Sequence, residues 1–127
     1  MIEIGPNLIA DTSQYIRRWY RLLAQNRWDE ASALIDEPNS YGMVFTPAEI
    51  RRVLAANYDF TDADTFTDPD ILPKEGRFSI CGYADGSGYS VEYDVPLNGE
   101  WSDLTAQFEL LVRPGGLAVV LHDLHVL

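Results

Sequence analysis

Apolar residues in the first half of the chain recur at helical spacing. Asp11 can cap a helix, and Gln14 can reach back to the capping residue. The apolar stripe that follows consists of Ile16, Trp19, Tyr20 and Leu23. A capping residue followed by a 3.6-residue apolar period is typical of an amphipathic helix. We therefore expect a first helix that begins at Asp11.

Two more helices are expected before residue 60. The spacing of Trp28, Ala31 and Leu34 predicts a short helix that ends before Pro38. In the segment Thr46-Pro47-Ala48-Glu49, the threonine can cap a helix, the proline suits its first position and the glutamate suits its third. The apolar run from Tyr41 to Phe45 is interpreted as a short strand between these two helices.

The second half alternates apolar and polar residues between turn signals, which predicts antiparallel strands. Asn98-Gly99 favours a two-residue hairpin turn, which sets Tyr93 opposite Leu104. A turn at Gly115-Gly116 would set Phe108 opposite Asp123 and Ala106 opposite His125, and the loop 85–88 would set Phe78 opposite Val95. The three turns agree on one apolar face, which would lie under the helices: Phe78, Ile80, Tyr89, Val91, Tyr93, Val95, Leu104, Ala106, Phe108, Leu110, Val119 and Leu121. A slip of one residue would move a strand's apolar set to the other face.

Two polar residues interrupt this expected core face, Asp123 and His125. Together with Tyr89 and Tyr93 on neighbouring strands they could line a polar pocket between sheet and helices. A buried charge needs a partner, so the pair would serve either in acid/base chemistry and ligand binding, or in hydrogen bonds to loops and helix ends.

The opposite face is polar on the inner strands and apolar on the last strand. Glu109 is expected to pair with His122, and Asp94 to lie opposite Asp103. The apolar residues of this face form a stripe: Leu111, Val120, Leu124 and Val126. Such a stripe would mark a site of homodimerisation or partner docking, unless the segment from Met1 to Ile4 covers it. His122 and His125 point to opposite faces of a strand, so they predict no metal site.

The charge of the chain narrows the classes of partner. Twenty acidic and nine basic residues give a net charge of −11, which repels nucleic acids and anionic membrane surfaces and favours encounter with a basic protein. The candidate partner surface combines acidic side chains with the apolar stripe: Asp62, Asp64, Asp68, Asp94 and Asp103. The acidic loop 59–70 lacks the ligand spacing of a calcium loop, so we expect neither a metal ion nor a cofactor.

Targeting and redox signals indicate the cytoplasm. The sequence contains a single cysteine, Cys81, and no apolar stretch long enough to cross a membrane, and its N-terminus lacks the basic start and apolar run of a secretory signal. Residues 1–127 are expected to form a single domain.

The order of elements resembles the nuclear-transport-factor-2-like group of the cystatin-like fold. The segments 97–106 and 121–127 also look like the C-terminal signature of small bacterial proteins of unknown function. The first resemblance implies an α+β cystatin-like roll, in which three N-terminal helices pack on a curved four-stranded antiparallel meander. Its members include ketosteroid-isomerase-like enzymes, ligand carriers and immunity proteins, so the fold does not select a function.

Two functional hypotheses follow from the sequence. In the first, the chain is a non-enzymatic cytosolic bacterial binding protein, for example an immunity protein that neutralises a basic toxin through its acidic surface. In the second, it is a small-molecule-binding or isomerase-like enzyme that uses Tyr89, Tyr93, Asp123 and His125.

Overall fold

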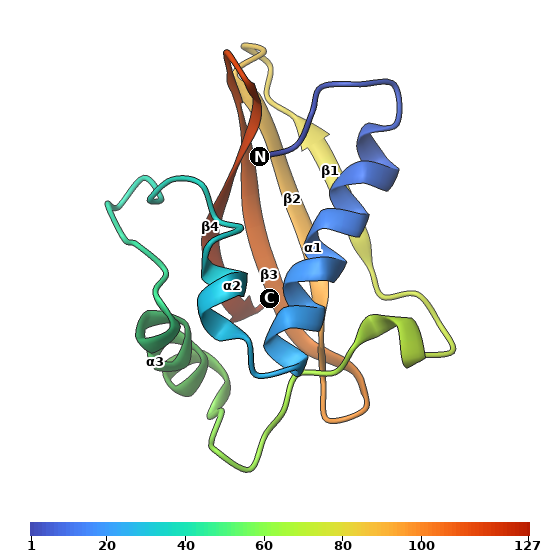
Figure 1. The fold of residues 1–127 in the computed structure, drawn as a ribbon, viewed down its shortest axis with the longest axis vertical. Helices are drawn as coiled ribbons and strands as arrows, with labels where there is room; N and C mark the ends of the chain where they lie inside the picture. The colour runs from blue at the N-terminus through green and yellow to red at the C-terminus, as the bar shows by residue number, and fades with distance from the viewer.

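The computed structural model describes all residues, 1–127, and places the helices before the strands, as expected for an α+β protein (Figure 1). The helices are α1 (Leu8–Ala24), α2 (Trp28–Ser32) and α3 (Pro47–Tyr58), and a short 3-10 helix, η1, covers Pro69–Ile71. The strands are β1 (Phe78–Gly82), β2 (Gly88–Leu97), β3 (Glu100–Arg113) and β4 (Gly116–Val126), which form one antiparallel sheet in sequence order. None of the helices combines the length and apolar character needed to span a membrane.

The helix starts are set by different signals. The side chain of Thr46 accepts a hydrogen bond from the backbone of Glu49, which confirms the cap expected for α3. By contrast α1 begins at Leu8, before the expected Asp11, and its capping residue Asn7 makes no side-chain hydrogen bond. Asp11 therefore lies in the first turn, where its negative charge interacts favourably with the helix dipole instead of capping the helix.

The strand expected from Tyr41 to Phe45 is absent. The side chain of Asn39 accepts hydrogen bonds from the backbone N–H groups of Tyr41 and Met43, both at 3.0 Å. This local bonding replaces a strand partner and holds the segment in a compact turn. Tyr41 is 80% exposed, and of the aromatic residues in this run only Phe45 enters the core.

The first two hairpins keep the expected faces although their registers differ. Asn98 and Gly99 form the turn, but a bulge between Asp94 and Pro96 then places Tyr93 opposite Ala106 instead of Leu104. Phe78 likewise lies opposite Tyr93 instead of Val95. Each difference amounts to two residues, and an even shift leaves every side chain on its expected face.

The last strand departs from the prediction in a way that matters for function. The turn between β3 and β4 is Pro114-Gly115 instead of Gly115-Gly116, so Phe108 lies opposite Leu121. A one-residue bulge at His122 then places Gln107 opposite Asp123, Ala106 opposite Leu124 and Thr105 opposite His125. An odd shift turns the end of β4 over. Asp123 and His125 consequently face away from the core, and Leu124 faces into it.

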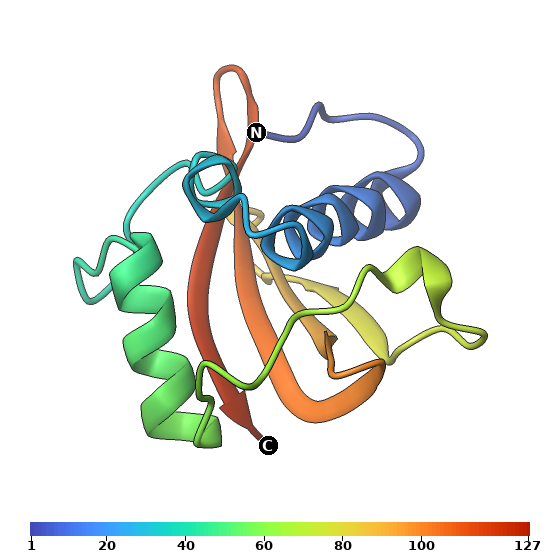
Figure 2. The ribbon, with the colours of Figure 1, turned by 60° about the horizontal axis from the view of Figure 1, so that its bottom comes forward.

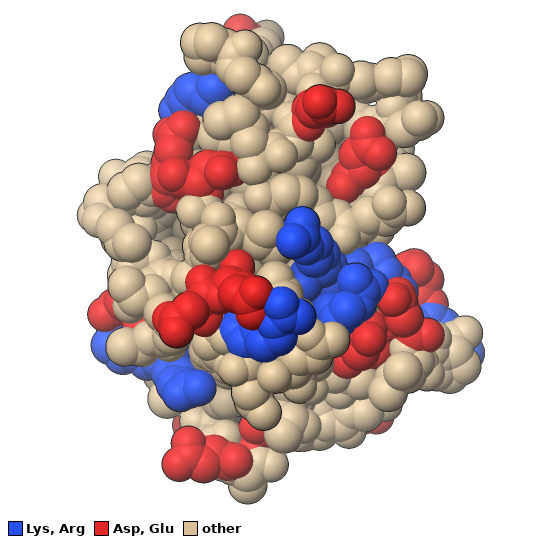
Figure 3. Space-filling view, viewed as in Figure 1, with Lys and Arg blue, Asp and Glu red and all other residues tan.

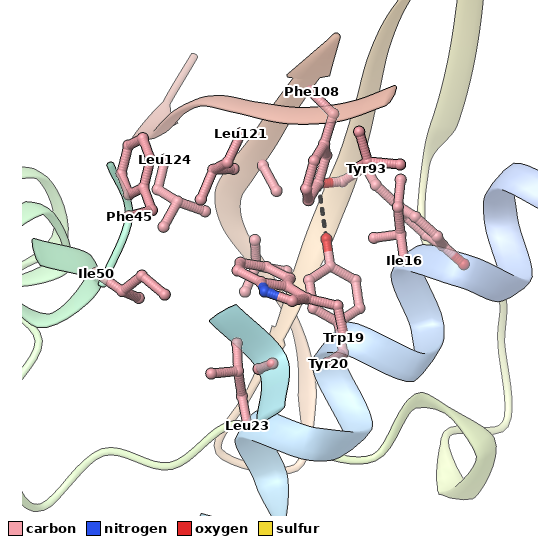
Figure 4. Close-up of a cluster of buried hydrophobic side chains, with 14 of the residues drawn as sticks. Ile16, Trp19, Tyr20, Leu23, Phe45, Ile50, Tyr93, Phe108, Leu121 and Leu124 are labelled. Atoms are coloured by element: carbon pink, nitrogen blue, oxygen red, sulfur yellow. Dashed lines mark hydrogen bonds between the residues drawn. The ribbon is translucent and has the colours of Figure 1, made fainter. Parts of the chain in front are cut away.

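The curled sheet wraps around α1, and the segment between α3 and β1 crosses the open end of the curl (Figure 2). Trp19 and Tyr20 of α1 point at Phe108 and Tyr93, while Phe45 and Ile50 lie beside Leu121 and Leu124 (Figure 4). The ring of Trp19 meets that of Phe108 edge-on, with centroids 5.4 Å apart, an arrangement that aromatic pairs favour.

Hydrogen bonds from other parts of the chain cover the free edge of β4. Ile2 exchanges backbone hydrogen bonds with Leu117. The backbone N–H of Asp36 donates to the carbonyl of Val119, and the carboxylate of Asp36 accepts from the N–H of Val119. The amides of Asn39 and Asn57 donate to the carbonyls of His122 and Leu124. These contacts occupy polar groups that an open strand edge would expose to other chains.

Candidate functional site

The structure does not bring the four residues of the expected pocket together. Tyr93 lies in the core, where its hydroxyl donates to Glu75 at 2.5 Å and accepts from Arg17 at 3.2 Å. Tyr89 is partly buried on the same face of the sheet. Asp123 and His125 lie on the other face and bond to each other, Oδ2 to Nδ1, at 2.8 Å. The bulge at His122 therefore separates the two halves of the expected site.

Acidic residues of the segment 68–75 are matched by arginines of α1. Arg17 contacts Asp70 at 2.8 Å and Glu75 at 2.9 Å, and Arg21 contacts Asp70 at 2.5 Å and Asp68 at 3.6 Å. The hydrogen bond from Arg17, and then that from Arg21, lowers the pKa of Asp70 below its usual range. Blue and red side chains interleave on this side of the molecule (Figure 3). We call this group the helix-side network: Arg17, Arg21, Asp68, Asp70 and Glu75.

Three of the five acidic residues expected to bind a partner are engaged within the protein. Asp68 belongs to the helix-side network, and Asp64 accepts hydrogen bonds from Thr61 and Asn98. Asp94 is only 8% exposed and accepts from the backbone and side chain of Arg77. Asp62 and Asp103 are exposed and form no ion pair, and Asp94 lies opposite Thr105 instead of Asp103.

The expected apolar stripe is not present as a continuous surface. Leu124 is fully buried in the core and Val120 is 1% exposed. Leu111 stays partly exposed, but the bulge turns Val126 to the core side of the sheet, opposite Leu104. Leu104 is seven positions from Leu111 along β3, a span of roughly 23 Å in a strand. The N-terminal segment does not cover this face either, because Ile2 packs in the core.

The outward side of the sheet is instead an acidic and polar surface. Paired positions on β2, β3 and β4 define this outer face: Ser90, Glu92, Asp94, Thr105, Gln107, Glu109, Asp123 and His125. It holds four carboxylates and neither lysine nor arginine. Arg77 borders it and binds Asp94, while Glu92 has no ion-pair or hydrogen-bond partner within the protein.

A hollow of about 350 Å³ lies on the outer face. Its floor is formed by residues of β2 and β3, and its walls come from Ser40, from Tyr83 after β1 and from His122 in the bulge. The hydroxyl of Tyr83 donates to Glu109 at 2.7 Å. Burial, followed by this hydrogen bond and the charge of Glu109, raises the pKa of Tyr83 to about 12.

His122 also lines this hollow, and one of its ring nitrogens is unpaired. Its ring lies next to that of the exposed Tyr41, with centroids 5.9 Å apart and planes tilted by 32°. Its Nδ1 atom is buried and has no hydrogen-bond partner within the protein. The expected pairing with Glu109 does not form, because Glu109 lies opposite Val120 and bonds Tyr83, but both residues line the hollow.

The alternation of β2 and β3 puts Glu92 and Glu109 on the outer face, but the sequence does not identify them as a site. Their shared face was the available signal, since Glu92 lies opposite Gln107, two positions from Glu109. Tyr83 and Ser40 carried no such signal, because they reach the hollow from a turn and a loop. No group of three or more His, Cys, Asp or Glu side chains is placed to hold a metal ion. The arrangement is chemically suited to bind positive charge.

Comparison with known proteins gives one match. A family described as "Domain of unknown function (DUF7668)" matches residues 8–127. No curated protein and no solved structure matches the chain.

Proposed function

Since the chain belongs to this family of unknown function, we propose a function from the site itself: a non-enzymatic cytosolic binding protein that docks a basic protein on the outer face of its sheet. The observation that carries this proposal is the concentration of four carboxylates on the outer face without an arginine or lysine among them. The helix-side network has the opposite character, because its carboxylates are matched by Arg17 and Arg21.

Electrostatics supports this choice of surface. A region of one sign attracts a partner of the opposite sign and speeds encounter, and it suppresses binding of acidic proteins. The net charge of −11 adds a field of the same sign. The attraction should weaken as salt rises, because the Debye length falls to roughly 10 Å at 0.1 M salt.

The alternative enzyme function had depended on four residues that now lie on two faces of the sheet. Tyr93 is enclosed in the core, while Asp123 and His125 face outward. This separation favours the binding function over an isomerase-like site built from these residues.

Two finer proposals accompany the binding function. The basic partner is a toxin that this chain neutralises as an immunity protein, and the curled sheet around α1 belongs to the nuclear-transport-factor-2-like group of cystatin-like rolls. The first is supported by the acidic outer face, the second by the order of elements and the antiparallel meander. Homodimerisation through the outer face also stays a prediction, although the continuous apolar stripe that suggested it is not present.

The docking proposal is tested by two matched triple variants. The outer-face variant carries Glu92→Gln, Glu109→Gln and Asp123→Asn. The control variant carries Glu3→Gln, Asp11→Asn and Asp29→Asn, at exposed acidic positions with no ion pair. Both variants lose three negative charges, one set from the outer face and the other from the helix side.

Each variant and the wild type is used to capture proteins from a lysate of the source organism and basic products of adjacent genes. We expect the wild type and the control variant to retain the same basic protein at low salt and release it at high salt, and the outer-face variant to lose it. Retention by both triple variants alike, or capture of no basic protein, contradicts the proposal.

Growth measurements test the immunity function. When the captured protein is expressed alone it should arrest growth, and co-expression of the wild type or the control variant should restore it. A captured protein that is harmless when expressed alone contradicts the toxin assignment without affecting the docking proposal.

A further inference from the structure

The hollow on the outer face has a shape and chemistry that go beyond general attraction to positive charge. Its volume of about 350 Å³ lies at the small end of the range for ligand pockets. It combines two carboxylates, Glu92 and Glu109, with the hydroxyl and aromatic ring of Tyr83 and the ring of His122.

The two carboxylates are spaced to share one ligand. Glu92 lies opposite Gln107, and Glu109 lies two residues further along the same strand. Such diagonal neighbours on adjacent strands have Cβ atoms roughly 7 Å apart or less. A group with several donors in one plane can therefore reach both carboxylates at once.

The walls of the hollow favour a flat group. Tyr83 lines one wall and His122 another, and Tyr41 lies next to His122 at the surface. Planar cations stack on aromatic faces as well as pairing with carboxylates.

From these features we infer that the hollow receives an arginine side chain of the basic partner, a conclusion that rests on the proposed docking function. The guanidinium bridges Glu92 and Glu109 and lies between the rings of Tyr83 and His122. Arginine suits the hollow better than lysine because its planar fork presents five donors, whereas an ammonium is a point charge with three. An anionic ligand is disfavoured by both carboxylates.

The test uses small probes, so it does not require the partner. The isotope-labelled protein is titrated with arginine amide, lysine amide and citrulline amide while its NMR spectrum is recorded. Citrulline amide has nearly the shape of arginine amide but lacks the side-chain charge. We expect arginine amide to shift the signals of Tyr83, Glu109 and His122 with a Kd on the order of 1 mM, lysine amide to bind more weakly, and citrulline amide to leave them unchanged.

Single variants locate the binding. Glu109→Gln should weaken arginine amide binding about tenfold or more, since it removes a charged hydrogen-bond acceptor. Glu3→Gln, with the same change of charge at an exposed position on the helix side, should leave the Kd unchanged. Glu92→Gln repeats the measurement without altering the bond between Tyr83 and Glu109, in case that bond is needed for folding.

Two results would overturn the inference: equal shifts with arginine and citrulline amides, or equal Kd values for Glu109→Gln and Glu3→Gln. If these occur while the outer-face variant still loses the basic protein, the arginine site is wrong and the docking proposal stands. If arginine amide binds as expected but both triple variants retain the same proteins, the docking proposal is wrong and the hollow remains a guanidinium site.

Discussion

The two sides of the sheet hold carboxylates in different ways. On the helix side, Arg17 and Arg21 pair with acidic residues that are more than 45 positions away in the sequence. On the outer face, Glu92 has no partner and Glu109 has only the hydroxyl of Tyr83. Net charge counts these residues alike, yet of these two groups only Glu92 and Glu109 on the outer face lack an arginine partner. The pairing of charges, more than their number, therefore locates the surface available to a basic partner.

The bulge at His122 decides which residues of β4 face the core. A substitution at one of these core-facing residues should have the largest effect on the free energy of unfolding. Leu124 is fully buried among core residues, whereas Val126 is 48% exposed. Leu124→Ala should lower the free energy of unfolding by about 3 kcal/mol, through lost burial and the cavity left behind. Val126→Ala should change it by less than about 0.5 kcal/mol. Urea denaturation measures both, and a loss for Leu124→Ala as small as that for Val126→Ala would contradict the bulge at His122.

The helix-side network should contribute to stability to a smaller extent. Arg17→Met keeps the apolar part of the side chain and removes its bonds to Asp70, Glu75 and Tyr93. Because the carboxylates are largely exposed, we expect a loss of about 1–2 kcal/mol in urea denaturation. Arg52→Met is the control, since it breaks an exposed pair with Glu49 within α3, and it should cost less than about 0.5 kcal/mol. Equal losses would show that the network is ordinary surface pairing.

Tyr83 gives a pH-dependent signal from the outer face. Its pKa is raised to about 12, so its contribution to stability is complete below the unfolded value of roughly 10 and is lost as pH rises through 12. Tyr83→Phe should therefore flatten part of the decline in stability over this range. In Glu109→Gln, the Tyr83 pKa measured by NMR should fall toward its ordinary value, because the charge is gone but burial remains. An unchanged pKa would contradict the contact between Tyr83 and Glu109.

The smallest expected effect concerns Glu92. Glu92→Gln removes an unpaired carboxylate from a face that carries three others. Its free energy of unfolding should stay within about 0.5 kcal/mol of the wild type. A loss well beyond this in urea denaturation would indicate that Glu92 has a structural partner, and the outer face would no longer differ from the helix side.

Local patterns explain which parts of the fold were predictable. The Thr46 cap of α3 and the Asn98-Gly99 turn depend on a few neighbouring residues, and both formed where expected. The face of each residue in β1 to β3 survived errors in register because those errors were even. The bulge at His122 did have a signal, since Leu124 follows Leu121 by three positions and breaks the two-residue alternation.

The candidate site depended on contacts that local patterns do not contain. Arg17 and Asp70 are 53 positions apart, and nothing near either residue reveals which charges are matched. The hollow needs Ser40 and Tyr83 from two separate connecting segments. The sequence therefore predicts a partner surface made of acidic residues, without showing which of them are paired. Only the folded arrangement distinguishes carboxylates that bond within the protein from those that do not.

The central claim is that the outer face of the sheet is the docking surface, and NMR mapping with the captured basic protein tests it most directly. The labelled chain is titrated with this protein at low salt, and the backbone signals that shift or broaden are assigned. We expect effects at Glu92, Gln107, Glu109 and Tyr83 on the outer face, with α1 and the segment 68–75 unaffected. Effects concentrated on α1 and the segment 68–75, with the outer face unchanged, would contradict it.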